Sequence, residues 1–282
     1  MINLENIYPD SFTLIEYLEK GRKPAAIGEI RQWGNRKYQK TSEGWVELKV
    51  GYAIDPNFNP LKSTTQRWLD KDGSWKKQRV EKVHKPIIDS YLEDKRVVSK
   101  KHPTVYLMMG APASGKGSVR RSFEGKYVEV DPDDIKMKGL KDDFDRYSKY
   151  SAELAAAKIH KEGSYLSKEI INKLTEKKTD FLIDKTYTDW NSLRTSIEKF
   201  KKAGYNVEVH LAWCPKKEAE KRKIDRFERT GRDVPRGFFD KSHGEVLDTF
   251  ELLKKNFPDI KRIRKINTLT NKVEYDSVEK ES

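Results

Sequence analysis

The stretch VYLMMGAPASGKGSVRRSF, residues 105–123, decides the fold of this chain. An apolar run ends at Gly110, and Gly115-Lys116 then opens a segment of helical character. The pattern G-x-x-x-x-G-K between a strand and a helix is typical of a phosphate-binding loop. Its glycines let backbone N–H groups turn toward phosphate oxygens, and its lysine adds a positive charge. We therefore expect a nucleotide to contact Gly110, Ala113, Ser114, Gly115, Lys116, Gly117 and Ser118.

Gly117 stands where a Ser or Thr normally holds magnesium in such a loop. Either the metal site is damaged, or the hydroxyl of Ser118 approaches the metal directly or through water. The run GAPASGKGS is similar to the loop of nucleoside monophosphate kinases, in which a glycine and then a hydroxyl residue follow the lysine. This similarity favours a working loop with Ser118 as a metal ligand.

Strand-like and helix-like segments alternate from residue 104 onward. Apolar runs predict strands at 104–110, 127–131, 179–184 and 206–213. Leu166, Ile170 and Leu174 recur at a spacing of four, which predicts a long helix with one buried face. Helices are expected over about 147–177, 192–203, 215–230 and 240–256. Such alternation predicts an α/β fold of the P-loop NTPase type, with a parallel sheet flanked by helices and ligands at the carboxyl ends of the strands.

The composition changes near residue 100. Residues 28–50 alternate apolar and polar side chains, which predicts two or three short strands in hairpins, and residues 66–99 are expected to be helical in their second half. We therefore expect two domains: a small, basic α+β appendage over 1–100, and the phosphate-loop domain over 101–282.

The bulk composition bounds the location and the partners of the chain. No run approaches the ~20 apolar residues that cross a bilayer, and the N-terminus lacks a secretory signal, so we expect a cytoplasmic protein without a membrane partner. The single Cys214 excludes an internal disulfide. The net charge of +13 leaves nucleic acid open as a partner, but basic and acidic residues are interleaved, as on solvated helix faces.

Acidic residues follow two of the expected strands. Asp131, Asp133 and Asp134 end the first, where one of them could cap the following helix. An Asp that faces a phosphate loop can accept the proton of a substrate hydroxyl and orient it for in-line attack. Asp184 ends a second strand and could hold magnesium or its waters, while Thr186 could bind substrate. An ordinary strand-end cap is the alternative for Asp184.

Arginines cluster late in the chain, in KIDRFERTGRDVPRGFF, residues 223–239. Arg222, Arg226 and Arg229 recur on one helix face, and Arg236 follows in a segment marked by Gly and Pro. Phosphoryl transfer needs cations around the transferred group, and a mobile segment that bears arginines can supply them. The alternative is an ordinary helix that forms salt bridges to its own acidic residues.

Four pieces of the sequence resemble, in order, the zeta toxin family of P-loop kinases. They are GAPASGKGS, VDPDDIK, HKEGSYLSKEI leading into DFLIDKT, and IDRFERTGRDVPR. The resemblance covers about residues 103–256. It implies a kinase that uses ATP and Mg²⁺ to phosphorylate a hydroxyl of a small-molecule nucleotide or nucleotide-sugar such as UDP-N-acetylglucosamine. It also implies a possible antitoxin partner, as in a toxin–antitoxin pair.

The resemblance also assigns roles to residues. It implies that Asp133 is the general base and Lys116 the loop lysine, and that Arg226 and Arg236 stabilise the transferred phosphate. It also matches Asp184 to the acid that precedes Gly-Thr in the family. Together with the strand-end positions, we expect Asp131, Asp184 and Thr186 to bind substrate, and Ser118 and Asp184 to bind magnesium. The chain departs from the family at Lys185, where the family has Gly, so the resemblance does not define the local substrate contacts.

Two alternatives stay open at this point. The polynucleotide 5′-kinase family also combines a phosphate loop, an Asp-Asp strand end and a late basic G-x-x-V-P segment. The stretch GEIRQWGNRKYQKTSEGWVE resembles a short module of phage-encoded proteins, which implies a virion-associated or assembly protein with a phage structural partner. The chain would then act in the host cytoplasm or the virion, and residues 1–100 could bind nucleic acid or neutralise a toxin.

Overall fold

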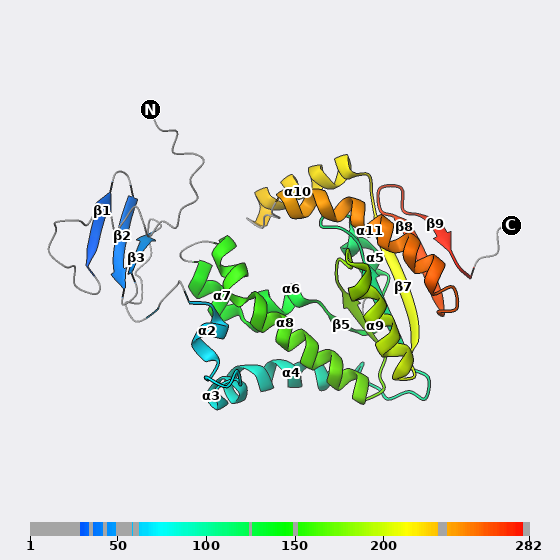
Figure 1. The fold of residues 1–282 in the computed structure, drawn as a ribbon, viewed down its shortest axis with the longest axis horizontal. Coiled ribbons are helices and arrows are strands. Elements are labelled where there is room, and N and C mark those ends of the chain that lie inside the picture. Colours follow the sequence, from blue (N-terminus) through cyan, green and yellow to red (C-terminus); the bar gives the residue numbers. More distant parts are fainter. Residues whose placement is uncertain are drawn as a thin grey trace. The chain divides into compact units, whose positions relative to one another are not determined.

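The computed structural model describes residues 29–33, 36–41, 44–48, 58, 62–123, 126–148, 152–230 and 236–278. The chain divides into two compact units (Figure 1). One unit comprises Met1–Leu69 and Asp142–Ile159, and the other comprises Asp70–Lys141 and His160–Ser282. The phosphate-binding loop and the strands around it lie in the second unit.

The second unit is built on a six-stranded sheet in the order β5-β6-β4-β7-β8-β9. Its strands are β4 (Thr104–Met109), β5 (Val128–Val130), β6 (Phe181–Asp184), β7 (Asn206–Trp213), β8 (Arg262–Asn267) and β9 (Lys272–Asp276). Neighbours from β5 through β8 run parallel, and β9 is antiparallel to β8. This sheet confirms the expected P-loop α/β fold and its four strands. The two further strands, RIRKIN and KVEYD, escaped prediction because neither contains an apolar run.

The long helix expected over 147–177 is α8 (Ala152–Glu176), and its predicted stripe of Leu166, Ile170 and Leu174 is fully buried. The three later helices are also confirmed. They are α9 (Trp190–Lys202), α10 (Lys216–Thr230) and α11 (Arg236–Asn256), and α9 packs against α11 (Figure 1). Gly204 follows α9 with φ +79°, a conformation in which glycine ends a helix at little cost.

A helical segment precedes the sheet in the second unit, as the sequence predicted. It consists of α3 (Lys77–Arg79), the π-helical turn η2 (Val80–His84) and α4 (Lys85–Leu92). Glu162 of α8 is fully buried and accepts hydrogen bonds from Arg79 at 2.7 and 3.0 Å, and His84 Nε2 lies 2.7 Å from the same carboxylate. Because a buried carboxylate needs such partners, these contacts fix the helical segment on α8.

The first unit contains a three-stranded antiparallel sheet of β1 (Ile30–Trp33), β2 (Arg36–Thr41) and β3 (Gly44–Leu48), which confirms the predicted hairpins. It also contains α2 (Thr64–Trp68) and α7 (Lys141–Ser148), the latter beginning at the boundary between the units. Phe58 and Tyr147 are buried with ring centroids 5.0 Å apart, and Tyr147 donates a hydrogen bond to the carbonyl of Lys62.

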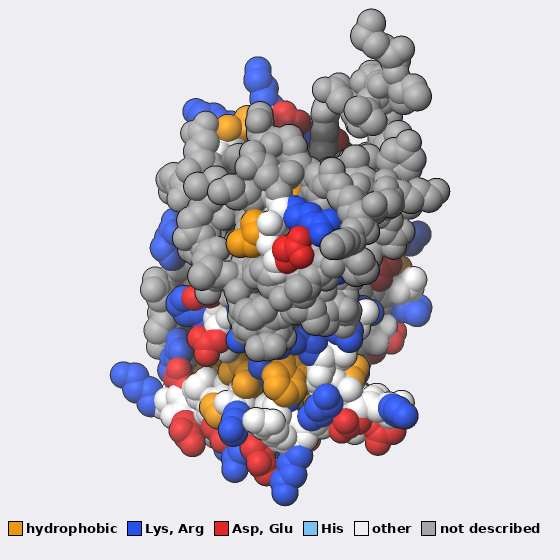
Figure 2. All heavy atoms as spheres, turned by 90° about the vertical axis from the view of Figure 1, so that its left-hand side faces the viewer, with side chains coloured by type: hydrophobic (Ala, Val, Ile, Leu, Met, Phe, Trp, Pro, Cys, Tyr) orange, Lys and Arg blue, Asp and Glu red, His pale blue; other side chains and the backbone are white. Residues whose placement is uncertain are grey.

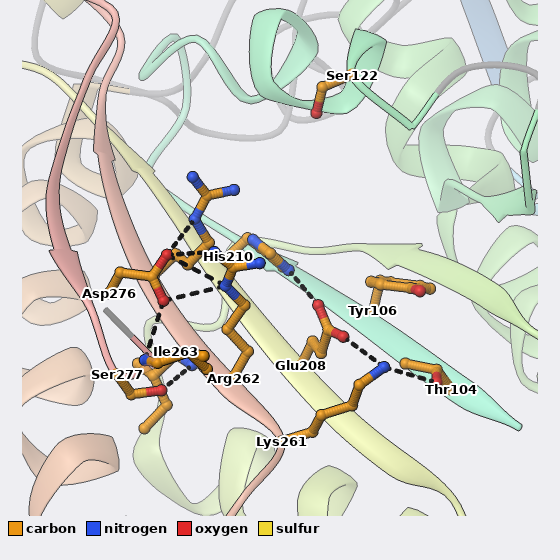
Figure 3. A network of polar contacts seen from close by, with 12 residues as sticks. Thr104, Tyr106, Ser122, Glu208, His210, Lys261, Arg262, Ile263, Asp276 and Ser277 are labelled. Carbon is orange, nitrogen blue, oxygen red and sulfur yellow. Dashed lines mark hydrogen bonds and ion pairs between the residues drawn. The ribbon is translucent and has the colours of Figure 1, made fainter. Parts of the chain in front are cut away.

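A network of polar side chains also lies on the sheet of the second unit, with charged members on β7, β8 and β9 and the uncharged Thr104 and Tyr106 on β4 (Figure 3). Glu208 accepts from Lys261 at 2.9 Å and lies 3.3 Å from His210 Nε2, while Arg262 pairs with Asp276. Burial raises the pKa of Glu208, but the hydrogen bonds from His210 and Lys261 outweigh it and leave that pKa below its ordinary value. The ionised carboxylate can only accept, so the proton of His210 lies on Nε2. His210 is buried, as expected for a core residue.

The surface of the described residues carries basic and acidic side chains side by side (Figure 2). Many are paired at close range, such as Lys201 with Asp259 at 2.6 Å and Lys216 with Asp240 at 2.7 Å. These pairs agree with the interleaved charge of the sequence. In the part of the chain that the structure describes, every helix is too short or too polar to span a bilayer.

Candidate active site

The loop between β4 and α5 (Lys116–Arg121) has the backbone of a phosphate-binding loop. Gly110 has φ +150°, and a Cβ there would lie 2.4 Å from the carbonyl oxygen of Ala212. Gly115 has φ +90°, and a Cβ there would lie 2.5 Å from Thr268 Oγ1. Only glycine fits at either position, so the two glycines of the motif are required by the geometry of the loop.

The side chains of the loop bond to the loop itself. Lys116 Nζ donates to the carbonyl of Gly110 at 2.9 Å, and the Ser118 hydroxyl donates to the carbonyl of Gly115 at 2.7 Å. Both hydrogen bonds stay within the loop and the first turn of α5, whose backbone N–H groups and lysine are the groups that bind phosphate in loops of this kind. A phosphate bound to Lys116 would have to accept the hydrogen bond that the Gly110 carbonyl accepts here.

Residues from the end of the chain support the loop from outside. Thr268, directly after β8, donates through Oγ1 to the carbonyl of Ser114 at 2.6 Å. Arg222 of α10 donates to Thr268 Oγ1 at 2.8 Å and to its carbonyl at 3.1 Å, and Arg222 also pairs with Glu218 at 2.8 Å. The first of the three expected arginines therefore braces the loop and forms an ordinary helix salt bridge.

The ends of β4 and β6 are joined beside the loop. The Gly110 N–H donates to the carbonyl of Thr186 at 3.1 Å, and the Lys185 N–H donates to the carbonyl of Met108 at 3.1 Å. These bonds hold the segment Asp184–Thr186 next to the phosphate loop, although nearly seventy residues of chain separate the two. Asp184 Oδ1 consequently lies 3.9 Å from Lys116 Nζ.

Arg120 contacts acidic side chains in and directly after β5 and at the end of β6. Its Nη1 lies 2.8 Å from Asp131 and 3.3 Å from Asp184, and its Nε lies 3.3 Å from Glu129. One arginine on the loop helix therefore bridges three neighbouring carboxylates. Arg120 was not among the site residues predicted from the sequence, because the adjacent Arg120 and Arg121 have the pattern of surface residues on a short helix.

Asp184 is an unusual carboxylate. Burial raises its pKa to about 6, and the nearby Asp131 adds to this rise, while Lys116 and Arg120 oppose it. A buried carboxylate that is costly to ionise favours binding of a cation, since a metal ion stabilises the charged form. Mg²⁺ takes oxygen ligands, usually one or two carboxylates together with waters and substrate phosphates. The buried Asp184 carboxylate fits that preference, and the Ser118 hydroxyl, in the first turn of α5, is the second oxygen expected from the sequence.

Asp131 and Asp133 take different positions after β5. Asp131 is the N-cap of α6 (Pro132–Asp134), where Oδ1 accepts from the Asp133 N–H at 2.8 Å, which confirms the expected cap. The Asp133 side chain is 42 % exposed and its Oδ1 lies 2.6 Å from Lys136 Nζ, in the following π-helical turn η3 (Ile135–Gly139). Of these two acids, Asp133 is therefore the one that a solvent-borne substrate can reach.

Of the remaining predicted site residues, the structure describes the side chains of Arg226 and Thr186 but not that of Arg236. Arg226 is half-buried on α10, one turn beyond Arg222, and Thr186 is half-buried beside Asp184. Arg236 is the first residue of α11, but its side chain lies outside the described part of the structure, as do residues 231–235. Among the described side chains, no three His, Cys, Asp or Glu residues are grouped as a protein-only metal site.

A P-loop at the carboxyl ends of a parallel sheet, faced by two acidic strand ends, defines a phosphotransferase of the P-loop kinase class. The sequence model of one family, described as zeta toxin, matches residues 88–280. The chain belongs to the zeta toxin family. A comparison with curated proteins gives no match.

Solved structures show the same fold. One belongs to the PezAT chromosomal toxin–antitoxin system of Streptococcus pneumoniae. It has 16% identity and a TM-score of 0.54, over 73% of this chain and 83% of the other. Another is the AvrRxo1-ORF1:-ORF2 complex with ATP, with 15% identity and a TM-score of 0.58, over 72% of each chain. At these identities the likeness concerns the fold.

Proposed function

We propose that this zeta toxin family kinase transfers the γ-phosphate of ATP to a hydroxyl of a nucleotide-sugar, with UDP-N-acetylglucosamine as the model acceptor. One observation carries the proposal: Arg120 joins Asp131, two residues before Asp133, and Asp184 to the helix of the phosphate loop. The two acidic strand ends and the helix of the phosphate loop share one arginine, which supports a donor site next to an acidic acceptor site, as in-line phosphoryl transfer needs.

The residues act in a simple sequence. Loop N–H groups and Lys116 bind the β- and γ-phosphates once Lys116 leaves the Gly110 carbonyl. The carboxylate of Asp133 accepts the proton of the acceptor hydroxyl as that oxygen bonds to the γ-phosphorus and the bond to ADP breaks. Arg226 and Arg236 stabilise the charge on the transferred group.

Asp184 and the Ser118 hydroxyl would hold Mg²⁺, which supplies positive charge to the donor phosphates. Asp184 must be ionised to bind the metal. Lys116, 3.9 Å from its carboxylate, and Arg120, 3.3 Å from it, are the cations that the metal would partly replace. Asp131 and Thr186 are assigned to the acceptor side. Lys185, which burial and Lys199 leave with a lowered pKa, stands beside them.

A protein partner also belongs to the proposal. Two similar folds come from complexes, the PezAT toxin–antitoxin system and AvrRxo1-ORF1 with ORF2. An antitoxin that covers the phosphate loop is therefore the expected regulator of this chain. Expression of the chain alone should then impair growth, and co-expression of its antitoxin should restore it.

The acceptor is tested by incubating the protein with labelled ATP and separate UDP-sugars, nucleosides and 5′-hydroxyl oligonucleotides. We expect label on a UDP-sugar and none on the oligonucleotide. The Asp133→Asn variant should lose about 10²–10⁴-fold in rate and keep its ATP affinity. The control is Asp134→Asn, because Asp134 is a neighbouring acid bound to the exposed Lys138 at 2.9 Å. Label on the oligonucleotide with the UDP-sugars untouched would replace this function by a polynucleotide 5′-kinase.

A further inference from the structure

Helix α8 contains a glycine in its interior, at Gly163. Glycine within a helix costs about 1 kcal/mol relative to alanine, so its presence needs a reason. A Cβ at Gly163 would lie 2.6 Å from Lys136 Cγ and 3.3 Å from Lys136 Cδ. By contrast, a Cβ at Gly244 of α11 would meet nothing within 4 Å. The missing side chain at Gly163 therefore makes room for the stem of Lys136.

Lys136 is a largely covered lysine that contacts an acid of the candidate site. Its side chain is only 13% exposed, and its Nζ lies 2.6 Å from Asp133 Oδ1. Burial lowers the pKa of Lys136, an effect that the charge of Asp131 opposes. Two positions later in the same turn, Lys138 makes a pair with Asp134 at 2.9 Å, but Lys138 is 77% exposed. The two pairs differ in burial of the lysine, and only the first has a glycine opposite its stem.

A lysine stem packed against a helix has few rotamers left, so its ammonium keeps one position at little further entropic cost. A short charge-assisted hydrogen bond then fixes the direction of the carboxylate that it contacts. An exposed lysine such as Lys138 loses more side-chain conformational entropy when it makes the same hydrogen bond.

We propose that Lys136 is a positioning residue for Asp133, held in place by the gap at Gly163. The proposal rests on the proposed role of Asp133 as the base. Lys136 keeps the Asp133 carboxylate directed toward the acceptor hydroxyl, and Gly163 keeps Lys136 against α8. A misdirected base transfers protons poorly even when ATP binds normally, because displacement of about 1 Å can cost ~10²-fold in rate.

The packing is tested by thermal unfolding, which needs no substrate. Gly163→Ala should lower Tm by about 2–6 °C in the wild-type chain, because the new Cβ meets the Lys136 stem. In a Lys136→Ala background the same substitution should leave Tm unchanged or raise it, because alanine favours the helix. Gly244→Ala, where space is open, is the control and should not lower Tm. A loss of Tm from Gly163→Ala that is equal in both backgrounds would overturn the proposal.

The charge is tested with Lys136→Met, which keeps the stem and removes the ammonium. With ATP and a UDP-sugar as probes, kcat should fall about 10–100-fold while the KM for ATP changes less than about twofold. Lys136→Arg should recover part of kcat, and Lys138→Met should behave as wild type. Unchanged kcat in Lys136→Met would overturn the role of the residue.

Failure of the proposed function gives a different result. If the wild-type chain phosphorylates no acceptor, the Tm measurements still decide whether Gly163 holds Lys136. The link to Asp133 is then measured by unfolding of Lys136→Met, Asp133→Asn and the double variant. We expect the two losses in Tm to be non-additive, because they remove the same contact. Full additivity would show that the pair is not coupled, and would overturn the proposal.

Discussion

The guanidinium of Arg120 lies 2.8 Å from the carboxylate of Asp131, so the helix of the phosphate loop is bonded directly to the end of β5. The same group lies 3.3 Å from Asp184, at the end of β6. This arginine therefore links the helix of the phosphate loop to the ends of two strands. Its removal should affect both stability and catalysis.

Arg120→Met should lower the free energy of unfolding by about 3 kcal/mol, because three carboxylates lose their shared cation and Asp184 is buried. Urea unfolding near pH 7 measures this loss. The control is Arg121→Met, since Arg121 is the exposed neighbour on the same helix and should change stability by less than about 0.5 kcal/mol. Equal effects of the two substitutions would contradict the bridging role.

Gly117→Ser should be tolerated and should strengthen Mg²⁺-dependent ATP binding several-fold. A Cβ at Gly117 meets nothing within 4 Å, and the new hydroxyl would stand where such loops normally hold the metal. Calorimetric titration of ATP with and without Mg²⁺ measures the change. A variant that folds but binds ATP–Mg²⁺ more weakly than the wild type would show that Ser118 already fills that role.

Gly115→Ala provides the contrast to Gly117→Ser, because a side chain at Gly115 has no room. Its Cβ would lie 2.5 Å from Thr268 Oγ1 and 2.7 Å from Arg222 Nη1, at a φ of +90°. We expect loss of ATP binding and a drop of about 1–3 kcal/mol in the free energy of unfolding. Normal ATP affinity in this variant would contradict the close packing of Thr268 on the loop.

Asp184→Asn should make the ligand-free protein more stable at neutral pH while removing phosphoryl transfer. Burial raises the pKa of Asp184 to about 6 in the folded protein, so ionisation opposes folding. The protonated form of Asp184 is the one that folding favours, so its contribution to stability is fully present below the unfolded pKa of about 4. That contribution is lost as the pH rises through the folded pKa of about 6. The asparagine variant should therefore gain about 1–3 kcal/mol near pH 8 and nothing near pH 3. A gain that does not depend on pH would contradict the raised pKa.

Glu162→Gln should destabilise the second unit by about 3 kcal/mol, because the buried Arg79 would lose its ionic partner. Denaturant unfolding followed by tryptophan fluorescence can report this change, since Trp75 packs against His84 with ring centroids 4.6 Å apart. The exposed pair of Lys77 and Glu81, 3.8 Å apart, provides the control. Glu81→Gln should change stability by less than about 0.5 kcal/mol.

Local patterns in the sequence were sufficient for the phosphate loop and for the strands and helices beside it. The positive φ angles of Gly110 and Gly115 follow from the spacing of the motif, since consecutive residues determine a loop of this kind. The buried stripe of α8 follows from a spacing of four. Asp131 as a helix cap also follows from its position directly before Pro132.

The charged strands β8 and β9 could not be predicted in the same way. Their side chains pair across the sheet, as Arg262 does with Asp276, and such pairs replace the apolar run that identifies a central strand. Because β8 was not predicted, the role of Thr268 was not predicted either. Thr268 lies directly after β8 and supports the phosphate loop. The signal that could have found these strands is the alternation of Ile263 with charged neighbours in RIRKIN.

The sequence by itself therefore determined the donor side of this kinase, because a phosphate loop is built from residues that are neighbours in the chain. The positions of the acidic strand ends relative to that loop depend instead on the tertiary structure. The order of the strands brings Asp184 to Lys116, the face of a short helix brings Arg120 to Asp131, and the gap at Gly163 admits Lys136. Each of these contacts joins residues that are distant in the chain or point in directions that only packing sets, so no local pattern encodes them.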